Sequence, residues 1–170
     1  MTWDGIPERF HATRLQGRKM ALDVARVLVD KGLPVQMEED VEAPEGMTPR
    51  EAAETFIDER DIVVGRRLIE GDLIEVKSSS YAFTDDYWPF REAFVTSKGR
   101  WERYPFKAFA FVLISQQTGA MRVIFPDRTE EWYPKTVKNS TRENRAMEVM
   151  CAPLSHLQPI EVLLDALDNR

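Results

Sequence analysis

The sequence predicts an α/β domain in which a mixed central sheet is flanked by helices, and three patterns support that fold class. Residues 8–31 carry apolar side chains at near-helical spacing, which predicts a long amphipathic helix. Two short runs rich in Val and Ile, near residues 60–65 and 72–78, lie close enough in the chain to form a β-hairpin. Residues 106–115 are apolar on both faces, as expected of a central buried strand.

The other elements are predicted from local start and stop signals. The run Gly32-Leu33-Pro34 ends the first helix, and Thr48 with a proline after it is a typical helix start. Gly119 turns the chain into a further strand, which Pro126 ends. In chain order we expect a strand over 34–39, a loop over 43–47, a helix over 48–56, a short helix capped by Ser97 (or a strand) over 97–104, a strand over 121–125, and helices over 141–150 and 159–167.

Length and composition indicate one globular domain over residues 1–170, with 43% hydrophobic and 31% charged residues. No apolar run reaches the roughly 20 residues that a membrane-spanning helix needs, and the N-terminus lacks the pattern of a secretion signal. Because Cys151 is the single cysteine, an internal disulfide and a cysteine-rich metal centre are excluded. These features favour a reducing, cytoplasmic setting.

The formal net charge of −6 counts against a nucleic-acid-binding protein, because such proteins usually carry a basic surface. The charges are unevenly distributed, however. Acidic residues concentrate in 36–61, whereas basic residues gather at Arg66-Arg67, within 98–107 and within 135–145. A local basic face on an acidic protein is compatible with this distribution.

The segment Glu75-Val76-Lys77-Ser78 carries the strongest functional signal. Residues two apart on a strand share a face at a separation of about 6.5–7 Å, so Glu75 and Lys77 project together. If the two Val- and Ile-rich runs pair as a hairpin, Asp61 can share one divalent cation with Glu75. Two alternatives remain open. In the first, Glu75 and Lys77 simply face water on a half-exposed strand. In the second, Asp72 replaces Asp61 as the first acid, which requires a bulge because residues 72 and 75 lie on opposite faces of a regular strand.

These residue types suit phosphodiester hydrolysis. Mg²⁺, or Mn²⁺ in its place, prefers oxygen ligands, which the carboxylates of Asp61 and Glu75 and the backbone carbonyl of Val76 supply. Such a cation neutralises the phosphate and lowers the pKa of a bound water, while Lys77 orients that water or stabilises developing charge. The candidates for contacting the phosphates of DNA are Arg66, Lys98, Arg100 and Arg103.

The element order and these residues together resemble the PD-(D/E)XK nuclease superfamily, which has the restriction-endonuclease-like fold. The resemblance covers about residues 8–115, and it puts the first acid of the family motif on Asp61 and the second acid and lysine on Glu75 and Lys77. The Glu-Val-Lys-Ser sequence is similar to the Holliday-junction-resolvase branch. Many members carry a glutamate on the first helix, for which Glu8 is the candidate, and Ser78 is a further accessory candidate.

The resemblance implies a Mg²⁺-dependent endonuclease acting on DNA, of the resolvase, repair or phage type, and by analogy a homodimer. The first rival interpretation is a catalytically inactive module of the same fold that binds nucleic acid or protein. The second is an unrelated α+β interaction protein in which the Glu-x-Lys pattern is accidental. Tyr81, Trp88 and Trp101 are candidates for stacking on an unpaired base, although the aromatic residues of 81–90 more often belong to a core or a lid.

Overall fold

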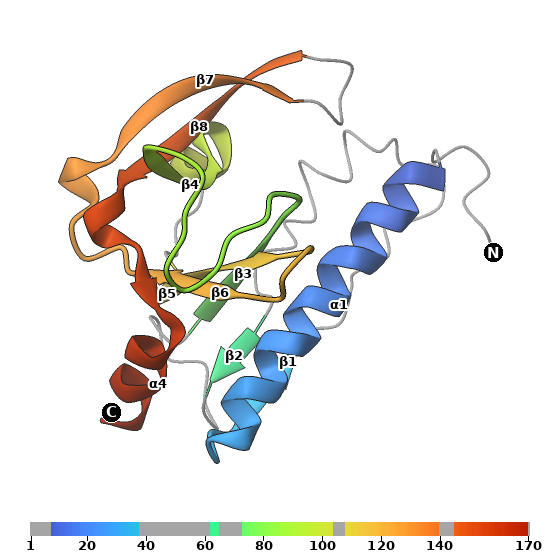
Figure 1. The fold of residues 1–170 in the computed structure, drawn as a ribbon, viewed down its shortest axis with the longest axis vertical. Coiled ribbons are helices and arrows are strands. Elements are labelled where there is room, and N and C mark those ends of the chain that lie inside the picture. Colours follow the sequence, from blue (N-terminus) through green and yellow to red (C-terminus); the bar gives the residue numbers. More distant parts are fainter. Residues whose placement is uncertain (1–7, 38–61, 65–72, 104–107, 140–144, 170) are drawn as a thin grey trace.

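The computed structural model describes residues 8–37, 62–64, 73–103, 108–139 and 145–169, which form two β-sheets and three α-helices (Figure 1). The helices are α1 (Glu8–Asp30), α3 (Lys98–Arg103) and α4 (Ile160–Asp168). The first sheet contains, in spatial order, β1 (Val35–Met37), β2 (Ile62–Val64), β3 (Leu73–Ser79), β5 (Ala110–Ser115), β6 (Met121–Ile124) and β9 (Gln158–Pro159). The second contains β4 (Glu92–Ser97), β8 (Arg145–Pro153) and β7 (Tyr133–Asn139).

The first sheet is mixed, as the sequence predicts. Strands β1, β2 and β3 form an antiparallel meander in which Ile62 pairs with Ile74, so the predicted hairpin pairing is confirmed. Strand β3 pairs in parallel with β5, and the β5–β6 and β6–β9 pairs are antiparallel. A parallel pair needs a long crossover connection, and the chain between β3 and β5 contains β4 and α3. Helix α3, whose Arg100 belongs to the candidate site, is therefore part of this crossover connection.

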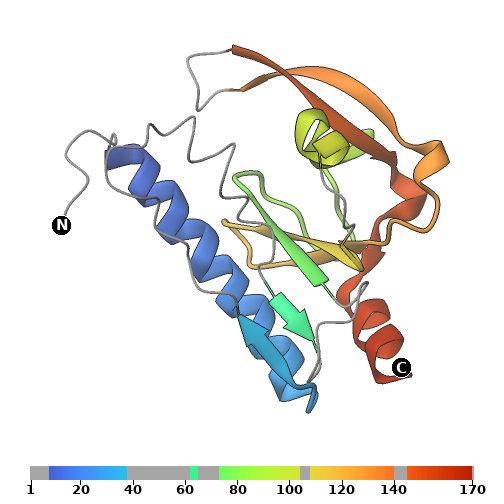
Figure 2. The same cartoon turned by 180° about the vertical axis from the view of Figure 1, so that it is seen from behind.

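Helices α1 and α4 cover one face of the first sheet. Figures 1 and 2 show α1 running along this sheet, with β1 and β2 beside its C-terminal half. Met20, Val24 and Leu28 are buried at helical spacing and pack in one cluster with Ile74 and Val112. The α4 side chains of this cluster are Leu163, Leu164 and Leu167. Both predicted helices are thus confirmed, and their apolar faces explain why they form where they do.

The second sheet covers the opposite face of the first sheet. Strand β5 is buried along its whole length, and its alternate residues divide between the two faces. Val112 belongs to the cluster under α1, whereas Phe111 and Leu113 pack with Trp132 of the segment before β7 and Met150 of β8. The expected central sheet flanked by helices is therefore present in part, with α1 and α4 on one face and a second sheet together with α3 on the other, and the buried central strand is confirmed.

Residues 145–150 form the first part of strand β8, so the predicted helix over 141–150 is wrong for the described part of that range. The local sequence contains good helix formers such as Ala146, Met147 and Glu148. Strand β8 nevertheless lies between β4 and β7 and pairs with both of them. Pairing on both sides and burial of Val149 and Met150 override the helix propensity.

Three local signals have clear structural counterparts. The predicted end of α1 coincides with Gly32, whose φ of +80° is the left-handed conformation that favours glycine. Gly119, with φ +73°, turns the chain between β5 and β6. Pro159 lies at the N-cap of α4, one position before the predicted first turn. The predicted loop over 43–47 and helix over 48–56 lie outside the described residues.

A polar bridge formed by Glu92, Tyr133 and Lys135 joins the two outer strands of the second sheet across β8. Lys135 on β7 pairs with Glu92 on β4, and the Tyr133 hydroxyl donates to the second oxygen of that carboxylate at 3.3 Å. The hydrogen bond from Lys135 lowers the pKa of Glu92 and raises the pKa of Lys135. Burial raises the pKa of the Cys151 thiol in β8 to about 11, so this cysteine is not a reactive thiolate at neutral pH.

Replacing Lys135 with Met should lower the melting temperature by a small amount that depends on pH. The folded-state pKa of Glu92 is depressed, so its stabilisation is present above the unfolded value of about 4.3 and is lost as pH falls through the folded value. The folded-state pKa of Lys135 is raised, so its stabilisation is present below about 10.4 and is lost as pH rises through the folded value. Thermal unfolding followed by circular dichroism should show the largest difference near neutral pH. A difference that does not change with pH would contradict this account.

Candidate active site

Strand β3 directs Glu75 and Lys77 to the face of the first sheet that carries the second sheet. Their neighbours Ile74 and Val76 belong to, or pack against, the apolar cluster under α1 on the opposite face. The alternation of a strand therefore places Glu75 and Lys77 together, as the sequence predicts. The ammonium of Lys77 forms an ion pair with Oε1 of Glu75.

Glu75 is buried, with only 6% of its surface exposed. This excludes the alternative in which Glu75 faces water on a half-exposed strand. A buried carboxylate without partners is costly, because the interior solvates its charge much less well than water does. Two cations offset that cost here: Lys77, and Arg100 of α3, whose Nη1 lies 3.4 Å from the same Oε1 atom. The side chains of Lys77 and Arg100 are 23% and 31% exposed, so the cluster connects the buried carboxylate to the surface.

Helix α3 brings Arg100 to this carboxylate from outside the first sheet. Ser97 caps the helix, because its Oγ accepts a hydrogen bond from the Arg100 N–H at 3.3 Å, and the prediction of a Ser97-capped helix is confirmed. Trp101 fixes the helix against the core, with its ring centroid 5.0 Å from that of Trp132 and 6.4 Å from that of Phe111. Cap and aromatic contacts together set the position from which Arg100 reaches Glu75.

Trp132 is in turn oriented by a buried histidine. Its indole N–H donates to Nδ1 of His156 at 3.2 Å, and Nε2 of His156 lies 2.9 Å from a carboxylate oxygen of Glu131. An indole nitrogen only donates, so Nδ1 accepts and Nε2 carries the proton that is donated to Glu131. This hydrogen bond lowers the pKa of Glu131. The successive side-chain contacts from His156 to Trp132 and from Trp132 to Trp101 hold α3 in place.

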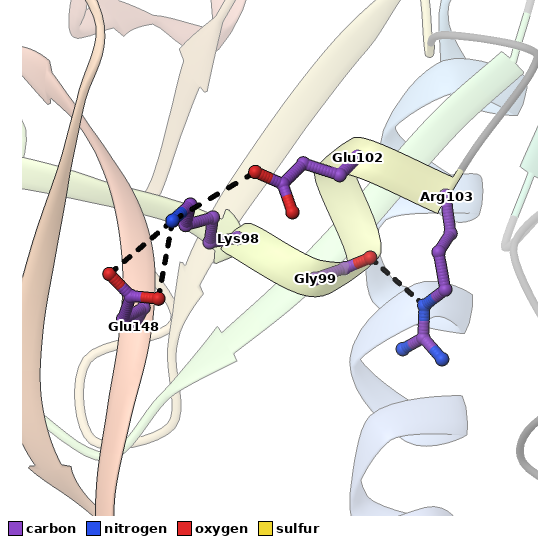
Figure 3. A network of polar contacts seen from close by, with 5 residues as sticks. All are labelled: Lys98, Gly99, Glu102, Arg103 and Glu148. Carbon is purple, nitrogen blue, oxygen red and sulfur yellow. Dashed lines mark hydrogen bonds and ion pairs between the residues drawn. The ribbon is translucent and has the colours of Figure 1, made fainter.

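The basic residues of α3 point in different directions (Figure 3). The Lys98 ammonium lies 3.3 Å from Glu148 of β8 and 3.9 Å from Glu102, so two carboxylates neutralise its charge. Arg103 lies on the other side of the helix, and its Nε donates to the carbonyl of Gly99 at 3.0 Å. Of the three predicted phosphate contacts on α3, only Arg100 lies at the Glu75 carboxylate.

The remaining predicted site residues are only partly described. Asp61, its alternative Asp72, and Arg66 lie outside the described residues, and Glu8 begins helix α1. Ser78 is exposed and its Oγ accepts a hydrogen bond from the Gln116 amide at 3.3 Å. Within the described part of the chain, no group of three or more His, Cys, Asp and Glu side chains is arranged to hold a metal ion.

The aromatic segment after β3 is largely a cover over the core. Phe83 is buried, and Trp88 packs on it while donating its indole N–H to the Glu92 carbonyl at 3.0 Å. Tyr81 is 52% exposed and packs edge-on against Phe90, with ring centroids 4.7 Å apart. Most of this segment therefore forms part of the core or a lid over it. The ring of Trp101 packs against Phe111 and Trp132. Tyr81 is the predicted stacking residue with the most exposed ring.

The pairing of Arg100 with Glu75 is the feature that the sequence pattern did not indicate. Arg100 was expected to contact phosphate, and no local signal places α3 beside β3. The Ser97 cap predicts the helix but not its docking.

No protein-family model, no curated protein and no solved structure matches this chain.

Removing both cations from Glu75 should destabilise the fold, whereas removing either one should cost little. The double variant Lys77→Met with Arg100→Met removes both cations that contact the buried carboxylate among the described residues, at a cost of about 3 kcal/mol in the free energy of unfolding. Each single variant retains one cation on Oε1. Adding Glu75→Gln to the double variant should recover most of the loss. Urea unfolding at neutral pH measures the four variants and the wild type, and a double variant as stable as the wild type would show that Glu75 needs neither partner.

Proposed function

We propose that this chain is a metal-dependent nuclease that hydrolyses phosphodiester bonds in DNA and has a restriction-endonuclease-like fold. The observation that carries the proposal is a buried carboxylate, Glu75, on a strand of a mixed sheet, with the Lys77 ammonium on the same face. The order of α1, the β1–β2–β3 meander and the parallel strand β5 agrees with the element order on which the resemblance rests. A homodimer that acts on the two strands of DNA is part of the proposal by analogy.

The proposal requires Asp61 as the second carboxylate. In the antiparallel pair of β2 and β3, Ile62 pairs with Ile74, and each step toward the start of one strand is a step toward the end of the other. Asp61 directly precedes Ile62 in the sequence and lies outside the described residues, and its role as the second carboxylate is part of the proposal. Two carboxylates are a typical donor set for one small divalent cation.

The donor set fits Mg²⁺ or Mn²⁺, because carboxylate and backbone carbonyl oxygens are the ligands such ions prefer. Bound there, the cation would neutralise a phosphate and acidify a water. Glu75, Asp61 and the carbonyl of Val76 would hold it. Lys77, already beside Glu75, would donate hydrogen bonds to the attacking water or to the phosphoryl oxygens as negative charge develops on them. Arg100 and Arg103 would contact neighbouring phosphates.

A second candidate function is a non-catalytic module that binds nucleic acid or protein. The net charge of −6 favours it, and so does the neutralisation of Glu75 by two cations, which gives the carboxylate a purely internal role. Divalent-cation binding separates the two candidates. Calorimetric titration with Mn²⁺ at millimolar concentration should show uptake by a nuclease and none by an internally paired module.

Purified protein should cleave DNA only when Mg²⁺ or Mn²⁺ is present. The substrates to compare are four-way junction, duplex, flap and single-stranded DNA, each with and without EDTA. Glu75→Gln, Lys77→Met and Asp61→Asn should each lower the cleavage rate by about 100-fold or more, because each removes a group that stabilises charge at the reaction centre. Glu161→Gln, an exposed glutamate in the first turn of α4, is the matched control and should cleave normally. Cleavage that survives Glu75→Gln or Lys77→Met would rule out the proposed site.

A further inference from the structure

We infer that His156 is a proton-sensitive switch that controls the aromatic contact on which α3 docks. The neutral imidazole accepts the hydrogen bond of Trp132 and fixes this indole against Trp101. Protonation of the imidazole removes the acceptor, so the two indole rings repack. The inference is independent of the proposed nuclease function, because it concerns side chains of the core and involves neither a metal nor DNA.

The hydrogen bonds of the neutral ring are the first step. The indole N–H of Trp132 donates to Nδ1 of His156 at 3.2 Å, and Nε2 of His156 lies 2.9 Å from a carboxylate oxygen of Glu131. His156 is 2% exposed and Trp132 is 7% exposed, so both partners are buried. Both nitrogens of an imidazolium carry protons, and an indole nitrogen only donates. Protonated His156 therefore cannot accept from Trp132, whichever way its ring is turned.

The charged groups around His156 keep the ring anchored when it is protonated, which is the second step. The hydrogen bond from His156 lowers the pKa of Glu131, so this carboxylate is ionised over the range of about pH 5 to 8 in which a histidine ordinarily changes its charge. Arg128 lies 3.7 Å from the other oxygen of Glu131, and Arg122 of β6 donates to the carbonyl of Leu157 at 3.1 Å. The groups of the polar bridge on the second sheet pair with one another. Glu131 is therefore the charge in direct contact with the imidazole, and protonation converts this contact into an ion pair while the contact to Trp132 is lost.

The packing of Trp132 carries the change to α3, which is the third step. The ring centroid of Trp132 lies 5.0 Å from that of Trp101 and 6.0 Å from that of Phe111. A buried N–H that loses its acceptor is costly, so the indole shifts toward another acceptor and changes its contact with Trp101. Trp101 also packs on Phe111 and makes a further interaction, so α3 stays attached to the core. The expected change is therefore a repacking of the two indole rings and not the release of the helix.

Circular dichroism and NMR of the untagged protein test the switch. Trp101 and Trp132 are close and their rings are inclined by 46°, so they should give an exciton couplet in the far-ultraviolet spectrum, which Trp101→Phe assigns by abolishing it. As the pH is lowered from about 8 to 5, the couplet should lose most of its amplitude. The midpoint of this loss should coincide with the titration of the His156 imidazole followed by NMR. The chain has two histidines, so one substitution assigns both sets of resonances.

Two asparagine variants complete the test. His156→Asn keeps a side-chain oxygen that accepts from the indole N–H but does not titrate, so its couplet should be present and independent of pH. His11→Asn removes the other histidine and should keep the pH dependence of the wild type. A couplet that stays constant while His156 titrates overturns the inference, and so does a pH dependence that persists in His156→Asn or a His156 that stays neutral until the protein unfolds. If His156→Asn does not fold, the couplet and the imidazole titration of the wild type and His11→Asn still decide.

Discussion

Glu75 places a negative charge within a sheet whose two faces are both covered, and the surrounding structure has to neutralise it. Lys77 does so from the same strand, through nothing more than the two-residue repeat of a β-strand. Arg100 does so from α3, which must dock in one position for its guanidinium to reach the carboxylate. The Ser97 cap and the packing of Trp101 on Trp132 set that position. The ion cluster and the aromatic core between the sheets are therefore mutually dependent.

What the sequence predicts well is what nearby residues determine. The buried positions of α1 repeat every three or four residues, and Gly32 ends the helix in a conformation that favours glycine. The β2–β3 pairing and the wholly buried β5 likewise follow from short patterns of Val, Ile and other apolar residues. The placement of Glu75 and Lys77 on one face belongs to this class, because spacing along a strand is local information.

What the sequence does not predict depends on partners far along the chain. Residues 145–150 have the propensity of a helix, yet β4 and β7 pair with β8 on both sides and make it the centre of a sheet. The burial of Glu75 has the same origin, since the exposure of a strand face depends on what packs over it. The contact between Arg100 and Glu75 joins positions in the crossover and in β3 that only tertiary packing brings together.

Under the proposed function, the charge balance of the cluster would reconcile an acidic chain with a DNA substrate. In the proposed function, Asp61 and Glu75 supply two carboxylates, and Lys77 and Arg100 supply two cations. Their formal charges would cancel, so the site without a metal would offer little attraction to a phosphate. A divalent cation would leave the same cluster net positive within a protein whose overall charge is −6. Attraction for the DNA backbone would then arise at the reaction centre, and only when the metal is bound, because the field of the rest of the surface is unfavourable. A broad basic face is not required for such an enzyme, since the metal itself supplies the local positive charge.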